Sequence, residues 1–535
     1  MVASLIPETA KKVLFTTETL VSAAKQSQGC HVVPIRLRRA IKRYLREQEN
    51  PNMRRKVLSL SQSFNKIKDA NLLLTSSTSK ELIDDPFKSM ERAQRWKIKS
   101  AYGDIGFKYR DDQTIAYIAS RMPAVYSACF RILKEVKRRL PDFAPKRVLD
   151  FGSGTGSVLW AVREVWPHSL ETINLVEPSK SMQRVGQSLL HGLKDLPLIQ
   201  SYDSLQTLMK DLNKSDRMHD LVMASYVLGE VPSLKDRITI VRQLWELTRD
   251  VLVLVEPGTP QGYSIIAQMR SHILWMEKRK CRKFKGVPDA ASKDIVSLNK
   301  GPNGAYIVAP CPHDGACPLQ NTGKYCHFVQ RLQRTSSQRS YKRSKGVPLR
   351  GYEDEKFCYV ALRKGQRPRE PWPLDGMKFD TLKEQHAKRI PKPLEINYED
   401  QVVTEDDDVQ YKDDLVSEDE GVPHEDDPVS YDSDYIETDG MNDYEEEEEP
   451  AARADLGSGW GRIVYTPVRR GRQVAMNVCR SIKEDGSEGS FERVVVTQSE
   501  NPALHKQARR SLWGDLWPLS SNDLQEFEPP KKSDG

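Results

Sequence analysis

The most constraining feature of the sequence is a glycine-rich turn between an apolar segment and an expected helix. Residues 147–151 are mainly apolar, which is typical of a short buried strand. The segment Asp150-Phe-Gly-Ser-Gly-Thr-Gly156 leads from this strand into an expected helix over 157–166. Glycine permits positive φ angles and close backbone approach, and the first turn of a helix has unpaired N–H groups. The pattern predicts a nucleotide-type cofactor at the start of this helix.

Strands and helices continue to alternate after this turn. Apolar strand patterns cover 172–177, 220–225 and 251–256, with helical patterns over 179–190 and 234–249. Alternation of this kind is typical of a parallel sheet with helices on both faces. The sequence therefore predicts an α/β, Rossmann-like fold for residues 136–265.

The spacing of the glycines indicates which cofactor the turn holds. Gly152, Gly154 and Gly156 follow the pattern Gly-x-Gly-x-Gly, whereas dinucleotide-binding turns have Gly-x-Gly-x-x-Gly, and residue 157 is Ser. This spacing favours an S-adenosylmethionine-dependent methyltransferase fold. A nicotinamide site, or a turn with a purely structural role, is the alternative.

Carboxylates near the turn are the expected polar contacts. Asp150 is placed to orient the loop amides or the amino group of the ligand, and Glu177 to accept both ribose hydroxyls. The segment 226–232 contains none of the motifs typical of amine methylation, and no Pro-Cys nucleophile for pyrimidine carbon-5 is visible. Glu230 and Glu256 are the nearest candidate acids or bases, but acids at strand ends are often structural. The catalytic residue is therefore left unassigned.

Residues 1–135 are expected to form a helical N-terminal region. Leu37, Ile41 and Leu45 recur at four-residue spacing above a basic face, and Pro123 marks a helix boundary or kink. The first 30 residues match neither a secretory signal nor a typical organelle presequence, and no run approaches the roughly 20 apolar residues of a membrane span.

The charge is divided between an acidic segment and a basic remainder. Residues 399–449 contain 24 acidic residues and one lysine, leaving 81 basic and 51 acidic residues elsewhere, a net charge of +30. A body this basic is expected to bind a polyanion, above all RNA. Its cations cluster at 278–285, 331–350 and 363–369. The acidic segment is expected to be a disordered insertion, either a solvated loop or a competitor of RNA.

Three of the eight cysteines lie close together in the basic region 266–398. Cys311, Cys317 and Cys326 have the spacing Cys-x5-Cys-x8-Cys, and Cys358 follows 32 residues later. This clustering favours a metal-binding segment in a reducing compartment over a disulfide framework. Buried thiols without a metal are the alternative.

Four thiolates can hold a 4Fe–4S cluster or zinc. The Cys-Pro dipeptides and the loose spacing favour the cluster. Zinc bound with His313 or His327 is the alternative metal site, and Cys281 is another candidate for the fourth ligand. After the acidic segment, strand-like alternation at 461–466 and 490–497 predicts a small β-rich, RNA-binding-like part within residues 450–535.

Several of these segments together resemble one family. The glycine turn, the cysteine loop, Arg121–Ala124, Glu256–Pro260 and Trp513–Trp517 are similar to those of the methyltransferase-like assembly factors of the mitochondrial small ribosomal subunit. The resemblance covers about residues 30–395 and 458–518. The chain departs from the family in its long acidic insertion and its atypical N-terminus.

The resemblance implies a mitochondrial matrix protein that binds the maturing small subunit and its ribosomal RNA and supports mitochondrial translation. It also implies a four-cysteine iron–sulfur site that maps onto Cys311, Cys317, Cys326 and Cys358, and a methyltransferase-like domain whose activity is weak or lost. We expect a monomer. The alternatives are an active S-adenosylmethionine-dependent methyltransferase of rRNA or protein, and a redox sensor that works through the cysteines.

Overall fold

The computed structural model describes eleven segments of the chain, all within one compact unit that joins residues 1–382 to residues 452–535. The described segments are 24–26, 29–48, 109–213, 216–231, 233–285, 304–320, 322–341, 351–368, 460–483, 485–500 and 502–517. The acidic segment 399–449 and the basic residues 283–285 and 342–350 lie outside the residues whose side chains are described.

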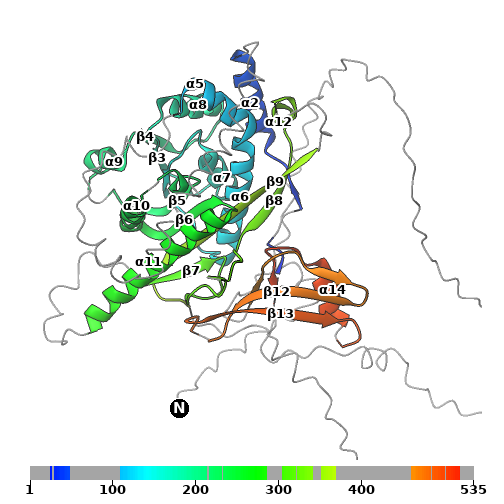
Figure 1. The fold of residues 1–535 in the computed structure, drawn as a ribbon. Helices are drawn as coiled ribbons and strands as arrows, with labels where there is room; N and C mark the ends of the chain where they lie inside the picture. Colours follow the sequence, from blue (N-terminus) through cyan, green and yellow to red (C-terminus); the bar gives the residue numbers. More distant parts are fainter. Residues whose placement is uncertain are drawn as a thin grey trace, which may run out of the picture. The chain divides into compact units, whose positions relative to one another are not determined.

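In the described segments, nine strands form one mixed sheet in the order β1-β8-β9-β6-β5-β2-β3-β4, with β7 beside β9 (Figure 1). The parallel part has the doubly wound order of a Rossmann-like fold, which confirms the predicted fold class. Its strands are β2 (Arg147–Phe151), β3 (Thr172–Val176), β4 (Leu198–Tyr202), β5 (His219–Ser225) and β6 (Thr248–Pro257). The sequence analysis identified all of these strands except β4.

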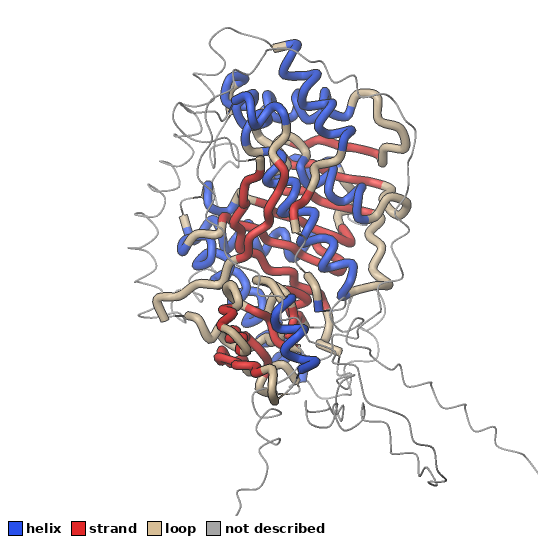
Figure 2. Tube along the Cα trace, turned by 90° about the vertical axis from the view of Figure 1, so that its right-hand side faces the viewer, coloured by secondary structure: helices blue, strands red, loops and turns tan. Residues whose placement is uncertain are grey.

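Each face of the sheet carries its own apolar core, because successive side chains of a strand point to opposite faces. Val148 packs into one core and its neighbour Leu149 into the other. Figure 2 shows helices on both sides of the strands. The first core contains side chains of α2 (Ile35–Glu47), α5 (Asp111–Ser120), α6 (Met122–Arg139), α7 (Ser157–Val165) and α8 (Lys180–Leu190). The second contains side chains of α9 (Leu205–Asp211), α10 (Leu234–Leu247) and α11 (Pro260–Lys285).

The helix patterns read from the sequence agree with these elements. Helix α2 buries Leu37, Ile41 and Leu45, as the four-residue spacing predicted. Pro123 occupies the first turn of α6, directly after the end of α5, so it marks a helix boundary. No helix among the described residues is long and apolar enough to cross a membrane.

The sheet continues beyond the expected limit at residue 265, which falls inside helix α11. Strand β9 (Tyr352–Lys364) runs antiparallel to β6. Along its other edge β9 pairs with β8 (Phe328–Gln333) and β7 (Ala305–Ala309), and β1 (Cys30–His31) pairs with β8. Tyr359 is buried in one core and Val360 in the other, so β9 has the two apolar faces of a central strand.

A second sheet forms the C-terminal part, as the alternation at 461–466 and 490–497 predicted. It contains β10 (Gly461–Ile463), β11 (Val468–Arg470), β12 (Gln473–Ser481), β13 (Gly489–Thr497) and β14 (Leu516–Trp517), packed with α14 (Pro502–Arg510). Buried Arg462 of β10 forms an ion pair with Glu135 of α6. Tyr359 of β9 also donates a hydrogen bond to Glu135, over 2.7 Å, so this carboxylate connects both sheets.

Candidate functional site

The glycine turn lies at the carboxyl end of β2, between that strand and α7. All three glycines have positive φ angles: +72° at Gly152, +53° at Gly154 and +86° at Gly156. A Cβ atom at Gly152 would lie 2.6 Å from a methyl of Val227, whereas nothing lies within 4 Å of a Cβ position at Gly154. Gly152 is therefore required for packing, and Gly154 faces open space where a ligand can approach.

Glu177 holds this turn through both carboxylate oxygens. Oε2 accepts from the backbone N–H of Gly154, and Oε1 accepts from the N–H of Ser179, each over 2.9 Å. The side chain is 6% exposed, and burial raises its pKa to about 7 although the two N–H donors act in the opposite direction. Glu177 is therefore in place beside the loop, but its contacts in the structure are to backbone rather than to ribose.

Asp150 is fully buried at the end of β2. Neither of its carboxylate oxygens has a hydrogen-bond partner in the described part of the chain. Burial, together with the charge of Glu177, raises the pKa of Asp150 well above its ordinary value. A buried carboxyl without a partner is costly, so these oxygens are suited to a polar group that the loop would bind.

The two candidate catalytic acids both have structural contacts. Oε1 of Glu256, at the end of β6, accepts from the backbone N–H of Leu228 over 2.8 Å, and the side chain is 1% exposed. Oε1 of Glu230 accepts from the hydroxyl of Tyr109 over 3.0 Å. These contacts explain both acids without a catalytic role, so the structure adds no candidate catalytic residue.

The predicted cysteine ligands lie on the loop between β7 and β8. Tyr263 of α11 donates a hydrogen bond from its hydroxyl to the Sγ of Cys317 over 3.2 Å. Burial raises the pKa of the Cys326 thiol well above its usual range, and the neighbouring thiols of Cys311 and Cys317 raise it further. The structure therefore brings the three predicted loop cysteines together.

A cysteine that the sequence analysis did not select joins this group. Cys479 lies on β12 of the C-terminal sheet, and its Sγ is 3.5 Å from Nε2 of His313. Burial raises the pKa of Cys479, and the thiols of Cys311 and Cys317 are the next largest causes. The chain thus places four thiols from two sheets within electrostatic range of one another, a group we term the cysteine cluster (Cys311, Cys317, Cys326 and Cys479).

Cys358, the fourth ligand predicted from the sequence, lies on strand β9. It stands opposite Glu256 in the β6–β9 pairing, and its Sγ donates to the backbone carbonyl of Cys326 over 3.1 Å. Burial and then the charge of Glu256 raise its pKa. The thiol of Cys358 raises the pKa of Cys326 less than the thiols of Cys311, Cys317 and Cys479 do. Its role as a ligand stays a prediction, and Cys479 is the better placed fourth thiol.

The other suggested ligands differ in position. Cys281 lies 18 residues beyond Tyr263 on α11, about 27 Å along the helix axis, which separates it from the cysteine cluster. The ring of His327 stacks on Tyr325 and meets Trp513 edge-on. In the described residues, no group of three or more His, Cys, Asp or Glu side chains has the spacing that holds a single metal ion.

Contacts between the cysteine loop and the C-terminal sheet explain how Cys479 reaches this position. The N–H of Asp314 donates to the carbonyl of Gly486 over 2.6 Å, and Nε of Arg462 donates to the carbonyl of Pro310 over 3.1 Å. A Cβ atom at Gly489 would lie 2.2 Å from the ring of His313. Because the two backbones pack this closely, β12 presents Cys479 to the loop.

The predicted basic clusters are partly neutralised by acids on neighbouring strands and on the loop between β7 and β8. Arg331 forms two hydrogen bonds with Asp354, and Arg363 two with Asp250. Arg367 does the same with Asp314, at 2.8 and 2.9 Å. These arginines contribute to the fold, so clustering in the sequence alone overstates the basic surface available to a polyanion.

Comparison with known proteins identifies the family. The family model described as "Mitochondrial small ribosomal subunit Rsm22" matches residues 111–418 and 407–518, which together span more than half of the chain. The chain belongs to the Rsm22 family. The resemblance stated from the glycine turn, the cysteine loop and the tryptophan segment is thereby confirmed.

Several curated proteins are similar to this Rsm22-family chain. "Ribosome assembly protein METTL17, mitochondrial" of Homo sapiens is 31% identical over 278 residues, covering 51% of this chain and 54% of the relative. "Rsm22-cox11 tandem protein 2, mitochondrial" of Schizosaccharomyces pombe is 25% identical over 466 residues, covering 85% and 49%. "Ribosome assembly protein RSM22, mitochondrial" of Saccharomyces cerevisiae is 24% identical over 456 residues, covering 75% and 66%. The chain spans about half the length of the first two relatives.

Solved methyltransferase structures also match part of the Rsm22-family chain. The plantazolicin methyltransferase BpumL in complex with SAH has a TM-score of 0.25 and 9% identity, covering 58% of this chain and all of that one. The magnesium protoporphyrin IX methyltransferase ChlM of Synechocystis PCC 6803 with bound SAM has a TM-score of 0.25 and 11% identity, covering 54% and 96%.

Proposed function

We propose that this Rsm22-family chain is an assembly factor of the mitochondrial small ribosomal subunit, which binds ribosomal RNA in the matrix and supports mitochondrial translation. The observation that carries the proposal is the family match across residues 111–518, together with relatives named as mitochondrial ribosome assembly proteins. All the curated relatives reported above are named as mitochondrial, which supports the mitochondrial location.

RNA binding is supported by the basic remainder of the chain, with a net charge of +30. Part of this charge lies at the surface of the described residues. Helix α2 exposes five cations along one face, while its opposite face packs into the first core. These are Arg36, Arg39, Lys42, Arg43 and Arg46. A helix with one basic face of this kind is suited to contact with phosphates, and we propose it as one part of the RNA-binding surface.

S-adenosylmethionine is the proposed ligand of the glycine turn. Three observations support it: the open space at Gly154, the unpartnered carboxyl oxygens of Asp150 and the position of Glu177 beside the loop. A bound S-adenosylmethionine supplies an activated methyl group. The chain's own contribution is to present backbone donors at the start of α7 and two carboxyl groups at the ends of β2 and β3.

An iron–sulfur cluster is the proposed occupant of the cysteine cluster, with zinc as the alternative. The donor set fits, because four sulfur ligands are what a 4Fe–4S cluster requires, and the thiols of Cys311, Cys326 and Cys479 are close enough to affect one another's pKa. With Cys479 as the fourth ligand, the cluster would join the loop at 311–326 to strand β12. We therefore propose that it stabilises the contact between the two sheets.

The second candidate function is an active S-adenosylmethionine-dependent methyltransferase of rRNA or protein. The observation behind it is the intact glycine turn, with open space at Gly154. Measurement of methyl transfer from labelled S-adenosylmethionine to small-subunit RNA and protein distinguishes the two functions. Turnover at ordinary enzymatic rates would favour the enzyme, and binding without turnover would favour the assembly factor.

Depletion of the chain from cells tests the proposed function. Density-gradient sedimentation of mitochondrial extracts then measures the ratio of small to large ribosomal subunits. The proposal predicts loss of mature small subunit with the large subunit retained, restored by the wild-type chain. An unchanged ratio after complete depletion would contradict the assembly role.

A further inference from the structure

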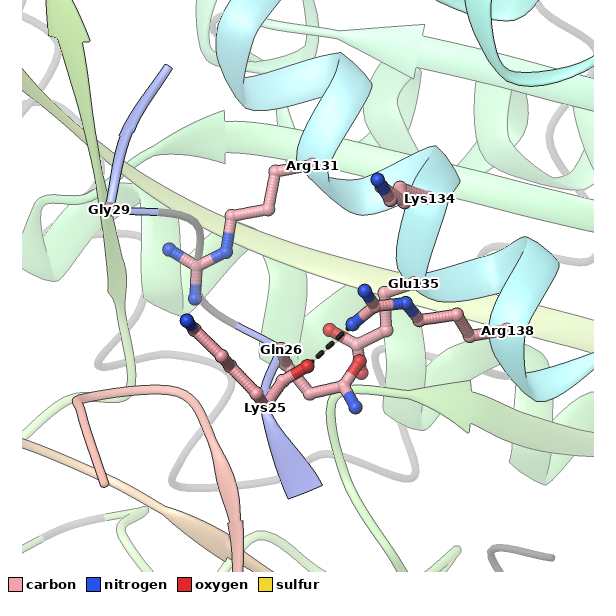
Figure 3. A pocket seen from close by; sticks show the side chains of 7 residues that line it. All are labelled: Lys25, Gln26, Gly29, Arg131, Lys134, Glu135 and Arg138. Atoms are coloured by element: carbon pink, nitrogen blue, oxygen red, sulfur yellow. Dashed lines mark hydrogen bonds between the residues drawn. The ribbon is translucent and has the colours of Figure 1, made fainter. Parts of the chain in front are cut away.

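A second candidate site lies between residues 25, 26 and 29 on one side and the C-terminal half of α6 on the other. It is a pocket of about 310 Å³ that opens to solvent (Figure 3). Four of the seven residues that line it are cationic and one is acidic. The lining residues are Lys25, Gln26, Gly29, Arg131, Lys134, Glu135 and Arg138.

Arg131 is the most informative of these residues. It is 4% exposed, and its Nη1 donates to the backbone carbonyl of Val329 over 2.5 Å. No carboxylate of the described residues lies within ion-pair distance of it, and Figure 3 shows the Lys25 amine pointing toward its guanidinium. The carboxylates of Glu135 and Asp515 act on this charge only from beyond ion-pair distance, and burial outweighs them, so the pKa of Arg131 is lowered. A buried cation without a contacting carboxylate is costly, and a second cation facing it increases the cost. An anion between the two side chains would remove both penalties.

The single acid of the pocket does not neutralise these cations. Glu135 is engaged by Arg462, by Arg139 over 3.1 Å and by the hydroxyl of Tyr359. Although burial acts to raise its pKa, Arg462 and then Arg139 lower it to about 2. Two arginines that do not line the pocket therefore already balance its charge. The charge offered to a ligand comes mainly from Lys25, Arg131 and Arg138.

The pocket is separate from the site of the glycine turn. Arg131 binds the backbone of β8, which lies four strands from β2 in the sheet order β2-β5-β6-β9-β8. At about 4.8 Å per strand, this places the two sites roughly 19 Å apart across the sheet. A ligand in the pocket is therefore not the cofactor of the glycine turn.

We propose that this pocket binds a backbone phosphate of RNA. The proposal rests on the proposed function, which supplies the RNA. A guanidinium presents its donors in a fork that matches phosphate oxygens, and the flanking lysines add charge without sequence preference. Because Lys25 and Arg138 are exposed, the pocket is accessible to a chain that passes over its rim. A contact of this kind fixes the orientation of the protein on the RNA and does not read bases.

The test compares two full-length variants that each lose three positive charges. K25Q/K134Q/R138Q alters the pocket but leaves buried Arg131 and the fold in place. K194Q/K210Q/K235Q is the matched control, with three exposed lysines from the loop after α8, from α9 and from α10. Binding of a fluorescein-labelled RNA hairpin is measured by anisotropy over a series of salt concentrations. Each phosphate contact contributes about 0.7–0.9 to the slope of log K against log salt, so the pocket variant, which loses one phosphate contact, should lose about that much from the slope.

The control variant should bind with the wild-type slope. Equal slopes for the pocket variant and the control would overturn the proposal. A second result would also overturn it, namely a pocket that binds free phosphate but not RNA. In that case inorganic phosphate would raise the melting temperature of the wild type but not of the pocket variant, while the two proteins would bind RNA with equal affinity. Sedimentation of the wild-type chain with mitochondrial small subunits tests the proposed function separately, because this binding does not depend on which residues contact phosphate. If the wild type sediments with the small subunit and the pocket variant keeps the control slope, only the pocket proposal fails.

Discussion

The backbone N–H of Gly154 donates to Oε2 of Glu177 over 2.9 Å, so the carboxylate predicted for ribose also holds the glycine turn. Its second oxygen accepts from Ser179, at the start of α8. One side chain therefore connects the turns that follow β2 and β3. A ligand that enters the loop must share this carboxylate with two backbone donors.

Replacing Glu177 with Gln is expected to weaken both the loop and its ligand. An amide retains one oxygen, so one of the two N–H donors would face an NH₂ group. Leaving a buried donor unsatisfied costs about 1–3 kcal/mol. We expect a loss of that size in the free energy of unfolding and weaker S-adenosylmethionine binding by calorimetry. Binding at wild-type affinity would show that Glu177 does not contribute to the ligand site.

The same residue predicts a pH dependence. Burial raises the pKa of Glu177 to about 7, from an ordinary value of 4.5, so the folded chain binds this proton more tightly than the unfolded chain. The resulting stability is complete below the unfolded pKa and is lost as the pH rises through about 7; the full difference is about 3 kcal/mol. Urea unfolding of the wild type and E177Q between about pH 5 and about pH 8 measures it. Parallel curves would contradict the shift.

Gly154→Ala is expected to reduce cofactor binding more than stability. The residue has a φ of +53° and open space around it, so alanine adds backbone strain of about 1–2 kcal/mol without a clash. Gly192→Ala is the matched control, because Gly192 also has a positive φ and nothing within 4 Å but lies beyond α8. We expect similar losses of stability and loss of S-adenosylmethionine binding only for G154A. Equal affinity for both variants would place the ligand elsewhere.

The fourth ligand of the cysteine cluster can be identified from single substitutions. The chain is purified without oxygen as Cys479→Ser and as Cys358→Ser, and iron and acid-labile sulfide are measured for each. The positions of the thiols predict that C479S loses the cluster and C358S retains it. The matched control is Cys281→Ser, whose thiol lies on the distant half of α11. The reverse pattern, with loss only in C358S, would support the ligand set predicted from the sequence.

The ion pair between Arg462 and Glu135 is expected to stabilise the contact between the two sheets. Both side chains are buried, so Arg462→Met leaves the Glu135 carboxylate without one of its two arginines. Breaking a buried ion pair in this way lowers the free energy of unfolding by about 3–5 kcal/mol. The control is Arg249→Met, whose pair with Asp220 is half exposed and worth about 1 kcal/mol or less. Urea unfolding measures both. Equal effects would mean that the buried pair does not hold the C-terminal sheet.

The sequence was sufficient for features that depend on neighbouring residues. Glycine spacing, apolar strand patterns and the change from a period of two to a period near four located β2, β3, β5, β6 and most of their helices. Strand β4 (Leu198–Tyr202) was missed because it is an edge strand that is only partly buried and carries polar residues such as Gln200 and Ser201. The alternation of apolar and polar residues did not distinguish it from a loop.

Features that depend on packing between distant segments were not predictable in this way. Cys479 follows Cys326 by 153 residues, with the acidic segment between them, and no local spacing relates the two. Cys358, which the family resemblance implied as the fourth ligand, lies nearer in the sequence, and its strand places it opposite Glu256. Likewise, the clustered arginines at 331–367 meet acids on neighbouring strands, and a run of charges gives no information about such partners.

Crosslinking in cells tests whether this chain acts on the mitochondrial small ribosomal subunit. A tagged chain is crosslinked to RNA and purified, and the bound RNA is sequenced. The account predicts strong enrichment of mitochondrial small-subunit ribosomal RNA over all other RNA. Enrichment of a different RNA, or recovery of none, would contradict it and make the methyltransferase function the first to test.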